Sequence, residues 1–545
     1  MAGKTLLADN AQVLSVFGQA TGTAPPALVT QDDGGTRIEW QGGVGVDLYD
    51  NRVTVPAATG NLTSPHGDGG FHRIQLTGDL RRHAPEERLA YLQFMATQSN
   101  DPAVQRHQVL VNSFQAGHAT PSTQFAFGDV NADFTALGTS LGVRGLLAAA
   151  RVGESTVSAV AGTLAPTWNA VMDEGVRTEY LRNVISAKID TPLTGTTRAF
   201  VSLQGYADDA ATLSLDQQAL LPASGRAATL GFNHQAGAFA LGGELGYSRW
   251  SPEGQSAHTD HALVIDGSWT AAAYSLRAGH HDLGGYYTSL SAQAQPGIRE
   301  TYLAGTWQAA PWLGLQGDLR RSENLAANTA GGAAAVRTDG ASFTENIGFG
   351  ANWPGLGLTL LQAVSNGENP DGSDNRQWGY GANLGYATQM WNGALGYNRR
   401  TLKNEAPAGG AGNGTTEVWS AQLGRNLMDD PANPTWVVNL GANASWQDQS
   451  LDAGGNTKTT QVGVNVSATR QGLGTLGAGI TLGWVEPNPA GNELKNLAYT
   501  LEATHPFKGD RGSVKLYARD TRNHSGNAAL KNTARTLGIQ LALAF

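Results

Sequence analysis

The sequence has no cysteine, few charged residues and no long apolar run. Its 545 residues include 71 Gly, 15% charged residues and a formal net charge of -9. Without cysteine, thiol catalysis, disulfide bonds and thiolate metal sites are excluded. The richest apolar run, Gly145 to Ala150, is stopped by Arg144 and Arg151. A membrane helix needs roughly 18 uninterrupted apolar residues, so we exclude a helical membrane protein.

The charge pattern gives no sign of nucleic-acid binding, and the first residues do not look like a secretory signal. The mild acidity and the lack of basic clusters leave no electrostatic footprint for nucleic acid. The N-terminus, Met1 to Lys4, lacks the basic and apolar profile of a secretory signal. We therefore expect a chain whose signal has been removed or replaced, and its location has to be inferred from the rest of the sequence.

Apolar residues alternate with polar or small ones in segments of about ten residues, each ending in Gly, Asn, Asp or Pro. Such alternation is typical of β-strands. The last segment is the clearest, because large apolar residues occupy every second position up to the end and small or polar residues occupy the others. The apolar face comprises Leu537, Ile539, Leu541, Leu543 and Phe545.

Aromatic residues recur at the ends of these segments. Trp436 and Trp446 bracket one apolar face, and ten residues of strand span roughly 33 Å, or about 25 Å across a membrane at a tilt near 40°. That is the height of a lipid-facing band flanked by aromatic girdles. Three more residues fit such a girdle: Trp484, Trp378 and Tyr386.

The opposite faces of the segments are polar and carry charges of both signs. As candidate lumen charges we identify Asp318, Arg320, Arg277, Lys515 and Arg519. They could select solutes, or they could solvate an inner wall and pair with one another or with plugging segments. A soluble β-sandwich also alternates, but the recurrent Trp and the terminal aromatic residue favour a membrane barrel.

The last strand, with Phe545 at its end, resembles the assembly signal of bacterial outer-membrane β-barrels. This resemblance implies a bacterial outer-membrane location, recognition of residues 537–545 by the barrel-assembly machinery, and contact with outer-membrane lipid and lipopolysaccharide. The alternative is that Phe545 ends an ordinary edge strand, although soluble proteins seldom leave such a strand exposed.

The expected fold is all-β, a large antiparallel up-and-down transmembrane barrel. About 18 segments precede the C-terminus back to Arg198–Ala207, and the total is about 26, in a range of 18 to 26. Residues 1–34 are expected to form an irregular periplasmic or lumen segment, and residues 35–545 the barrel. A separate periplasmic or plug domain in the first 170 residues is the alternative. The N-terminal segments that we single out are Ile38–Leu48, Ile74–Leu80, Arg88–Thr97, His107–Gly117, Gln124–Val130, Val143–Ala150 and Val157–Leu164.

A second resemblance covers about twenty residues. The stretch from Phe125 through Phe134 to Gly145 is similar to a segment of large outer-membrane barrels of the export type. It implies a size class rather than a substrate.

No motif indicates an enzyme, a cofactor or a metal site. Gly138 to Gly142 matches the nucleophile elbow of serine hydrolases, but no helix follows, as that motif requires. His280 and His281 are adjacent, and adjacent residues on a strand point to opposite faces and cannot chelate one ion.

The expected width of the lumen separates the possible functions. Barrels of 16 to 18 strands leave an aqueous channel and 22-stranded ones are plugged, so about 26 strands, roughly 50 Å across, would need closing. We favour a gated channel for export or secretion of a protein, a fibre or a polysaccharide, closed by its own segments or by a periplasmic or lumen-plugging partner. The alternatives are a diffusion porin and a structural sheath that holds a partner protein in its lumen.

Overall fold

The computed structural model describes most of the chain. The described residues are 28–31, 36–54, 68–102, 108–173, 175, 177, 179–213, 221–291, 296–325, 336–368, 373–405, 413–452, 455–487, 493–507, 511–527 and 531–545. Of the segment 1–34, Leu28–Gln31 form a short strand, β1, and the other residues lie outside the described part.

Nearly every described element is a strand, as the alternating pattern predicts. No helix in the described part is long and apolar enough to span a membrane. The helical elements are α1 (Trp168–Met172) and the 3-10 turns η2 (Ala210–Thr212) and η5 (Gly350–Asn352). The strands are β1 (Leu28–Gln31), β2 (Arg37–Thr54), β3 (Gly69–Ala84), β4 (Arg88–Ser99), β5 (Val109–Ala119), β6 (Thr123–Asp133), β7 (Thr139–Val152), β8 (Ser155–Leu164), β9 (Leu181–Pro192), β10 (Thr197–Asp209), β11 (Ala223–Ala236), β12 (Phe239–Pro252), β13 (His258–Thr270), β14 (Tyr274–Leu283), β15 (Leu290–Ser291), β16 (Ile298–Ala310), β17 (Leu313–Asn324), β18 (Val336–Gly348), β19 (Leu356–Glu368), β20 (Asp374–Ala387), β21 (Trp391–Asn404), β22 (Gly414–Met428), β23 (Trp436–Leu451), β24 (Thr457–Arg470), β25 (Gly474–Pro487), β26 (Leu494–Phe507), β27 (Gly512–Ser525) and β28 (Asn532–Ala544).

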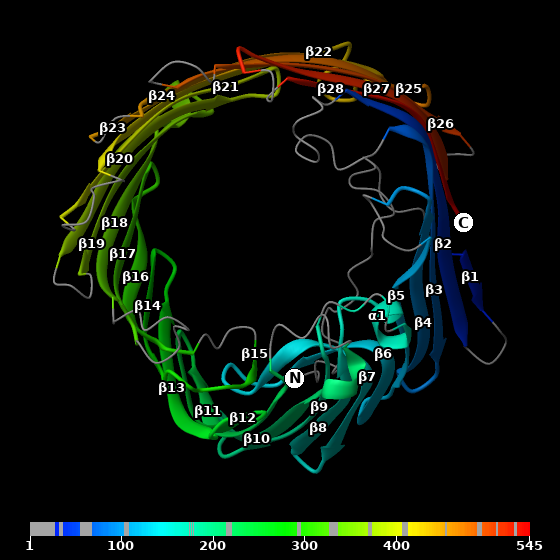
Figure 1. Ribbon diagram of the computed structural model, residues 1–545, viewed down its shortest axis with the longest axis vertical. Coiled ribbons are helices and arrows are strands. Elements are labelled where there is room, and N and C mark those ends of the chain that lie inside the picture. Colours follow the sequence, from blue (N-terminus) through cyan, green and yellow to red (C-terminus); the bar gives the residue numbers. More distant parts are fainter. Residues whose placement is uncertain are drawn as a thin grey trace.

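Twenty-six of these strands, β2–β14 and β16–β28, form a closed antiparallel barrel. Each pairs with the next along the chain, and β28 pairs with β2 from Ala544 opposite Gly43 to Thr533 opposite Thr54. Figure 1 shows this ring from one end. The predicted fold and strand number are confirmed, and β9 is the barrel strand that the sequence did not single out.

The two ends of the barrel differ in the length of their connections. At one end, called the turn end, connections run from two residues (153–154) to seven (349–355). At the other, called the loop end, they run from five residues (134–138) to sixteen (165–180). The last strand ends, and β2 begins, at the turn end.

Contacts with β15 and the loop before it fix which side chains face inward. This loop lies inside the ring (Figure 1), and it contacts Gln204 on β10 and Ser248 on β12. Residues directly opposite in an antiparallel ladder share a face, and successive residues alternate. The strand registers therefore carry this assignment round the whole barrel.

Large apolar side chains cover the outer face. Examples are Leu48 on β2, Leu245 on β12 and Leu516 on β27, which are 49%, 59% and 55% exposed. Soluble monomers rarely expose a contiguous apolar patch larger than a few hundred Å². An apolar belt that continues round a closed barrel is the surface that lipid chains would cover.

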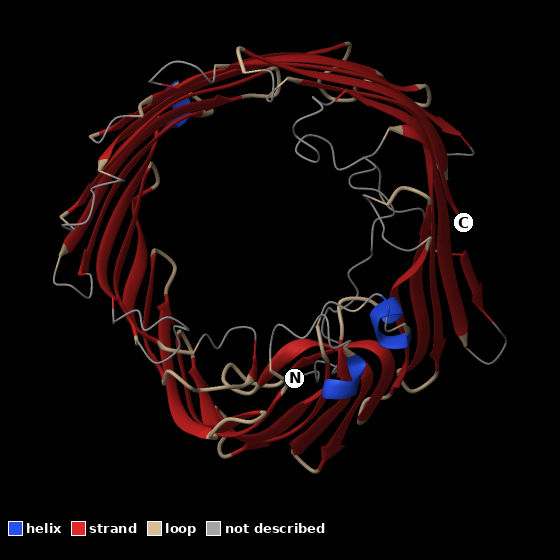
Figure 2. Ribbon diagram, viewed as in Figure 1, coloured by secondary structure: helices blue, strands red, loops and turns tan. Residues whose placement is uncertain are grey.

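The inner face is covered over only part of the ring. All the buried apolar side chains of the described residues lie between Ala119 and Leu290. Strands β6–β14 form a lined arc, where loops pack against the inner wall, whereas β16–β28 form a bare arc (Figures 1 and 2). None of the described helices and strands crosses the middle of the ring in Figure 2.

Candidate functional site: the lumen wall

Two loops from the loop end form the lining of the lined arc. Loop A, Phe134–Gly138, joins β6 to β7, and loop B, Gly284–Ser291, follows β14 and ends in β15. β15 pairs in parallel with the start of β7, Leu290 opposite Thr139. Apolar side chains of both loops join those of the wall in two clusters, one around Phe134 and Leu290 and one around Leu137 and Tyr287. Loop A lies within the segment Phe125–Gly145 that was singled out in the sequence.

Leu137 is the point where both loops and the wall meet. Its backbone N–H donates to the Glu244 carboxylate on β12 (3.1 Å), and its carbonyl accepts from the Tyr287 hydroxyl (2.9 Å). Burial and the nearby Glu244 raise the pKa of Tyr287 above its ordinary value, so the hydroxyl stays a donor. Gly246 lies under this ring, because a Cβ there would be 2.3 Å from the Tyr287 oxygen.

Gln204 anchors the end of loop B. Its side-chain oxygen accepts from the Thr139 hydroxyl (3.0 Å) and from the Leu290 backbone N–H (3.0 Å). The Thr139 oxygen also lies 2.7 Å from the Ser186 hydroxyl oxygen. Gln204, Thr139, Ser186 and Leu290 are each at most 7% exposed. Hydrogen bonds hold the loop because they satisfy groups that burial removes from water.

Four buried polar atoms beneath the loops have no hydrogen-bond partner among the described residues: Ser202 Oγ, Gln204 Nε2, Thr229 Oγ1 and Glu244 Oε1. Ser202 and Thr229 lie directly opposite each other on β10 and β11. Leaving such atoms unsatisfied costs about 1–3 kcal/mol each. Bound water bridging them would remove this cost, so the contact between the loops and the wall includes polar positions beside its two apolar clusters.

One seam of the wall is held partly by side chains. β5 and β6 pair only from Gln115 opposite Gly128 to Ala119 opposite Gln124. Beyond that point, Asp129 accepts from the Phe114 backbone N–H at 2.7 Å. The side chain of Asn169 on α1 bonds the N–H of Val111 (3.2 Å) and the carbonyl of Val109 (2.9 Å). Helix α1 thus completes the half of β5 that β6 leaves unpaired.

Arg277 lines a hollow of about 1320 Å³ near the turn end of the lined arc. Asp266 organises its floor, because it accepts hydrogen bonds from Tyr302 (2.6 Å) and contacts the His281 imidazole (3.0 Å). Arg277 forms no ion pair with any described residue. The hollow therefore offers a guanidinium, an imidazole and a carboxylate to a polar ligand.

The other predicted lumen charges lie on the inner face of the bare arc. Arg320 donates to Glu300 at 3.3 Å, and Lys515 lies 2.5 Å from Glu502. Arg519 stacks over the Tyr517 ring, 5.4 Å from its centre. Asp318 lies opposite Ala304 and Ser342. The structure places them inward on two strands, β17 and β27, without bringing the two pairs together, so they line a wall and do not form one site.

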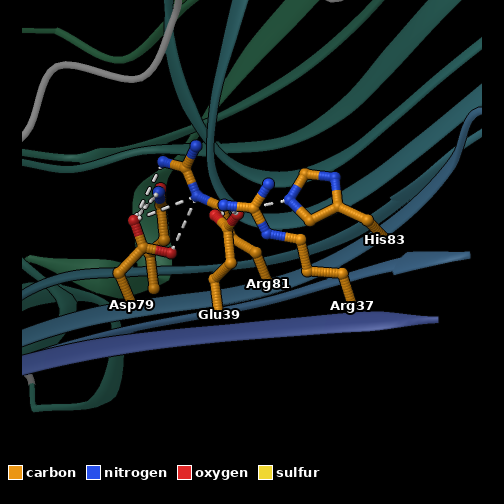
Figure 3. Close-up of polar contacts among 6 residues, drawn as sticks. Arg37, Glu39, Asp79, Arg81 and His83 are labelled. Atoms are coloured by element: carbon orange, nitrogen blue, oxygen red, sulfur yellow. Dashed lines mark hydrogen bonds and ion pairs between the residues drawn. The ribbon is translucent and has the colours of Figure 1, made fainter. Parts of the chain in front are cut away.

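A second inner cluster lies at the turn end of β2 and β3 (Figure 3). Glu39 contacts Arg37 (2.5 Å) and His83 (3.5 Å), and Arg81 pairs with Asp79 at 2.9 Å. Positive and negative side chains alternate here as they do on the bare arc. The inner wall is consequently polar but nearly balanced in charge.

The predicted assembly strand is β28, and its large residues all point outward. The backbones of Phe545 and Gly42 exchange hydrogen bonds of 2.8 and 3.0 Å. The Phe545 ring lies 5.1 Å from that of Trp40 and covers Gly42, where a Cβ would be 2.6 Å from the ring. Its last residue is thus fixed against the first barrel strand, and recognition by assembly machinery stays a prediction.

The predicted girdle residues also face outward, at two heights. Trp436 and Tyr386 lie near the turn end, whereas Trp446, Trp484 and Trp378 lie near the loop end. Trp446 is directly opposite Trp419 on β22. Their role at a lipid interface stays a prediction.

The two motifs that were set aside lie on strands. Ser140 of the Gly138–Gly142 motif is on β7, where its hydroxyl donates to Asp133 at 3.0 Å. His280 contacts Thr301 on one face, and His281 contacts Asp266 on the other. Within the described ranges, no group of three His, Asp or Glu side chains could hold a metal ion.

Comparison with known proteins gives distant structural similarities. No family model matches the chain, and no curated protein matches it. The siderophore receptor PirA from Pseudomonas aeruginosa is 11% identical, with a TM-score of 0.42 over 93% of this chain and 80% of that one. The P pilus usher PapC translocation pore is 10% identical, with a TM-score of 0.32 over 93% and 99%. OccK3 (OpdO) from P. aeruginosa is 10% identical, with a TM-score of 0.28 over 93% and 96%. The chain is a large β-barrel that resembles bacterial outer-membrane proteins.

Proposed function

We propose that this barrel is an outer-membrane channel that exports a macromolecule and is closed at rest by its own segments or by a partner. The observation that carries the proposal is the closed ring of 26 strands with a polar inner wall. Barrel diameter grows with strand number, which gives roughly 50 Å for this ring. A permanently open hole of that width would abolish the permeability barrier of the membrane.

The chemistry of the inner wall fits passage better than capture. On the bare arc, Arg320 pairs with Glu300 and Lys515 pairs with Glu502. Exposed ion pairs of this kind contribute only about 0–1 kcal/mol each, and they leave the wall hydrophilic without a strong field of one sign. A long polymer can slide along such a surface, whereas a wall of one charge would bind an oppositely charged polymer tightly.

The orientation follows the rule that outer-membrane barrels have short periplasmic turns and longer extracellular loops. The turn end, with the start of β2, would face the periplasm, and loops A and B would enter the lumen from outside. Because these loops line only β6–β14, closure requires a further element against the bare arc. The N-terminal segment and a periplasmic partner protein are the two candidates.

Planar-bilayer recording of the purified barrel tests the proposal. If the chain closes itself, openings will be rare or small, and removal of the residues before Gly35 or of loop B will enlarge them. If a partner closes the barrel, the purified chain will leak and become quiet when the partner is added. A stable, ungated conductance of ordinary porin size that truncation leaves unchanged would contradict both versions and favour a diffusion porin.

A sheath that holds a partner protein is the second candidate, and the asymmetry of the inner wall favours it. A folded protein could rest against the bare arc while loops A and B fill the opposite side. Purification from native membranes distinguishes the two functions. A stoichiometric partner that leaves no conductance when bound and is never released would support the sheath over the export channel.

We also propose that β28 is recognised by the barrel-assembly machinery. Phe545→Asp should sharply reduce assembled protein in the outer membrane, because the charge replaces a ring that packs on Trp40 and Gly42. Heat-modifiable mobility and membrane yield measure assembly. Glu486→Asp, a conservative change on β25 at the opposite end of the barrel, is the control. Unchanged yield for Phe545→Asp would refute the proposal.

A further inference from the structure

Arginine side chains on the outer face near the loop end almost all have a carboxylate partner. Arg52 and Arg535, for example, lie directly opposite each other on β2 and β28, but Asp50 and Asp520 neutralise them at 3.0 and 2.9 Å. Outward arginines with a carboxylate oxygen within 3.4 Å include Arg52, Arg299, Arg321, Arg337, Arg376, Arg399, Arg522 and Arg535. Pairing is therefore the rule at this height.

Arg226 and Arg249 depart from that rule. They lie directly opposite each other on β11 and β12, point outward and are exposed. Neither forms an ion pair with any residue in the described ranges, including Glu253 four positions beyond Arg249. Like charges directly opposite each other in a sheet are destabilising. An anion from outside the described chain would therefore stabilise this pair of guanidinium groups.

The surroundings of the two arginines indicate where that anion comes from. One outward row nearer the middle of the wall lie Ala228 and Tyr247, followed by Leu230 and Leu245. Tyr247, Leu230 and Leu245 are 60%, 57% and 59% exposed. Four residues of tilted strand correspond to about 10 Å along the barrel axis. The arginines thus stand about one headgroup depth above the apolar belt.

The neighbouring strands leave room for a bulky group at this height. Gly205 on β10 is the outward partner of Arg226, and Thr259 on β13 is that of Arg249. Both side chains are small, so no bulky side chain of β10 or β13 stands beside the guanidinium groups at this height. Arginine presents two parallel N–H donors, which match the oxygens of a phosphate.

We propose that Arg226 and Arg249 together bind a phosphate group of lipopolysaccharide, whose acyl chains lie against Leu230 and Leu245. This rests on the orientation given with the proposed function, because it requires the loop end to face outward. It does not depend on what passes through the lumen. A conductance that contradicts export therefore leaves the lipid site standing.

The test compares two like-charged pairs in the full chain. The double variant R226Q with R249Q removes the arginines that have no ion pair. The double variant R52Q with R535Q removes two arginines that also lie directly opposite each other but that aspartates already neutralise. After purification in detergent, lipopolysaccharide per barrel is measured by native mass spectrometry. We expect at least a tenfold loss of retained lipid for the first pair, and retention close to the original for the second.

Titration of the unaltered protein keeps the proposal testable if the first double variant fails to assemble. Lipopolysaccharide should bind at least tenfold more tightly than its dephosphorylated form or inorganic phosphate. Equal retention in all variants, equal loss in both pairs, or equal binding of the dephosphorylated lipid would overturn the site. Tighter binding of phosphatidylglycerol vesicles than of lipopolysaccharide would overturn the choice of lipid, and equally tight inorganic phosphate would reduce the site to one for a free anion.

Discussion

The lined arc and the bare arc are built from the same kind of strand, but their inner faces have different surroundings. Along β6–β14 an inner layer of loops buries side chains such as Val143 and Val184, which are 1% and 5% exposed. Along β16–β28 the described wall is one strand thick, and its inner face holds ion pairs that water reaches. One barrel can therefore combine a part with two layers of protein and a part with a single layer whose two faces contact lipid and water.

The largest contrast is expected for matched tyrosines on the inner face. Tyr206 of the lined arc covers Gly225, bonds Thr288 of loop B at 2.8 Å and is 8% exposed. Tyr517 of the bare arc covers Gly538 and bonds Asp47 at 2.9 Å. Replacing a buried aromatic residue by Ala costs about 3–5 kcal/mol.

We therefore expect that loss in unfolding free energy for Tyr206→Ala and about half of it for Tyr517→Ala. Unfolding by denaturant in detergent, followed by tryptophan fluorescence, measures both. Equal losses would contradict the idea that the loop layer adds packing to one arc.

A charge introduced on each face sharpens the contrast. In the bare arc, Leu440→Arg on the outer face should cost about 2–4 kcal/mol near the bilayer midplane, because the charge meets lipid. Asn443→Arg on the inner face should cost little. In the lined arc, Val184→Arg should be costly although it faces inward, because loop layer and wall exclude water there. The same unfolding measurement serves for all three, and equal effects on both faces of β23 would refute the register.

Loop A should detach from the wall more often when the hydrogen bond between Leu137 and Glu244 is removed. Glu244→Ala leaves the buried N–H of Leu137 without its acceptor, which costs about 1–3 kcal/mol. Because the chain has no cysteine, Leu137→Cys can report accessibility to a thiol reagent in the presence and absence of Glu244→Ala. We expect faster labelling of position 137 in the Glu244→Ala background.

Glu300→Ala, which breaks an ion pair of the bare arc, is the control for that experiment, and it should leave labelling of position 137 unchanged. Unaltered labelling in the Glu244→Ala background would mean that loop A is held by other contacts. Faster labelling in both backgrounds would mean that the lined arc responds to the wall as a whole.

How much could be foreseen from the sequence differs between the arcs for a physical reason. In the bare arc the residues of every strand face lipid and lumen in turn. The alternation alone therefore predicts that residues such as Leu440, Ile480 and Leu516 lie on the outer face. The strand number and the fold follow from repeating that argument. β9 was not singled out, because its outward Ile185 and Ile189 are separated by small and charged residues that dilute the alternation.

The lining of the other arc left no periodic signal. Leu137 meets Glu244 and Tyr287 across 107 and 150 positions, and no local pattern predicts such contacts. Loop B resembles any polar loop in composition, and α1 has five residues, too few for a helical period. Inner glycines such as Gly225 and Gly246 were the available clue, because a glycine on a strand often marks a close approach.

The smallest effect is expected in a turn of the bare arc, where Asp429 accepts hydrogen bonds from the Thr435 hydroxyl and from the backbone N–H groups of Thr435 (2.9 Å) and Trp436 (3.2 Å). These hydrogen bonds, that of the Thr435 hydroxyl foremost, lower the pKa of Asp429 to about 2. An unfolded aspartate titrates near a pH of about 3.9. The stabilisation is therefore present above about pH 4 and is lost as the pH falls through about 2. Hydrogen exchange, corrected for intrinsic rates, should show constant protection of the Thr435 and Trp436 amides from pH 7 to about pH 4 and falling protection below it. Asp429→Asn should abolish that pH dependence, and full protection of the unaltered turn at pH 2 would show that β22 and β23 hold it without the carboxylate.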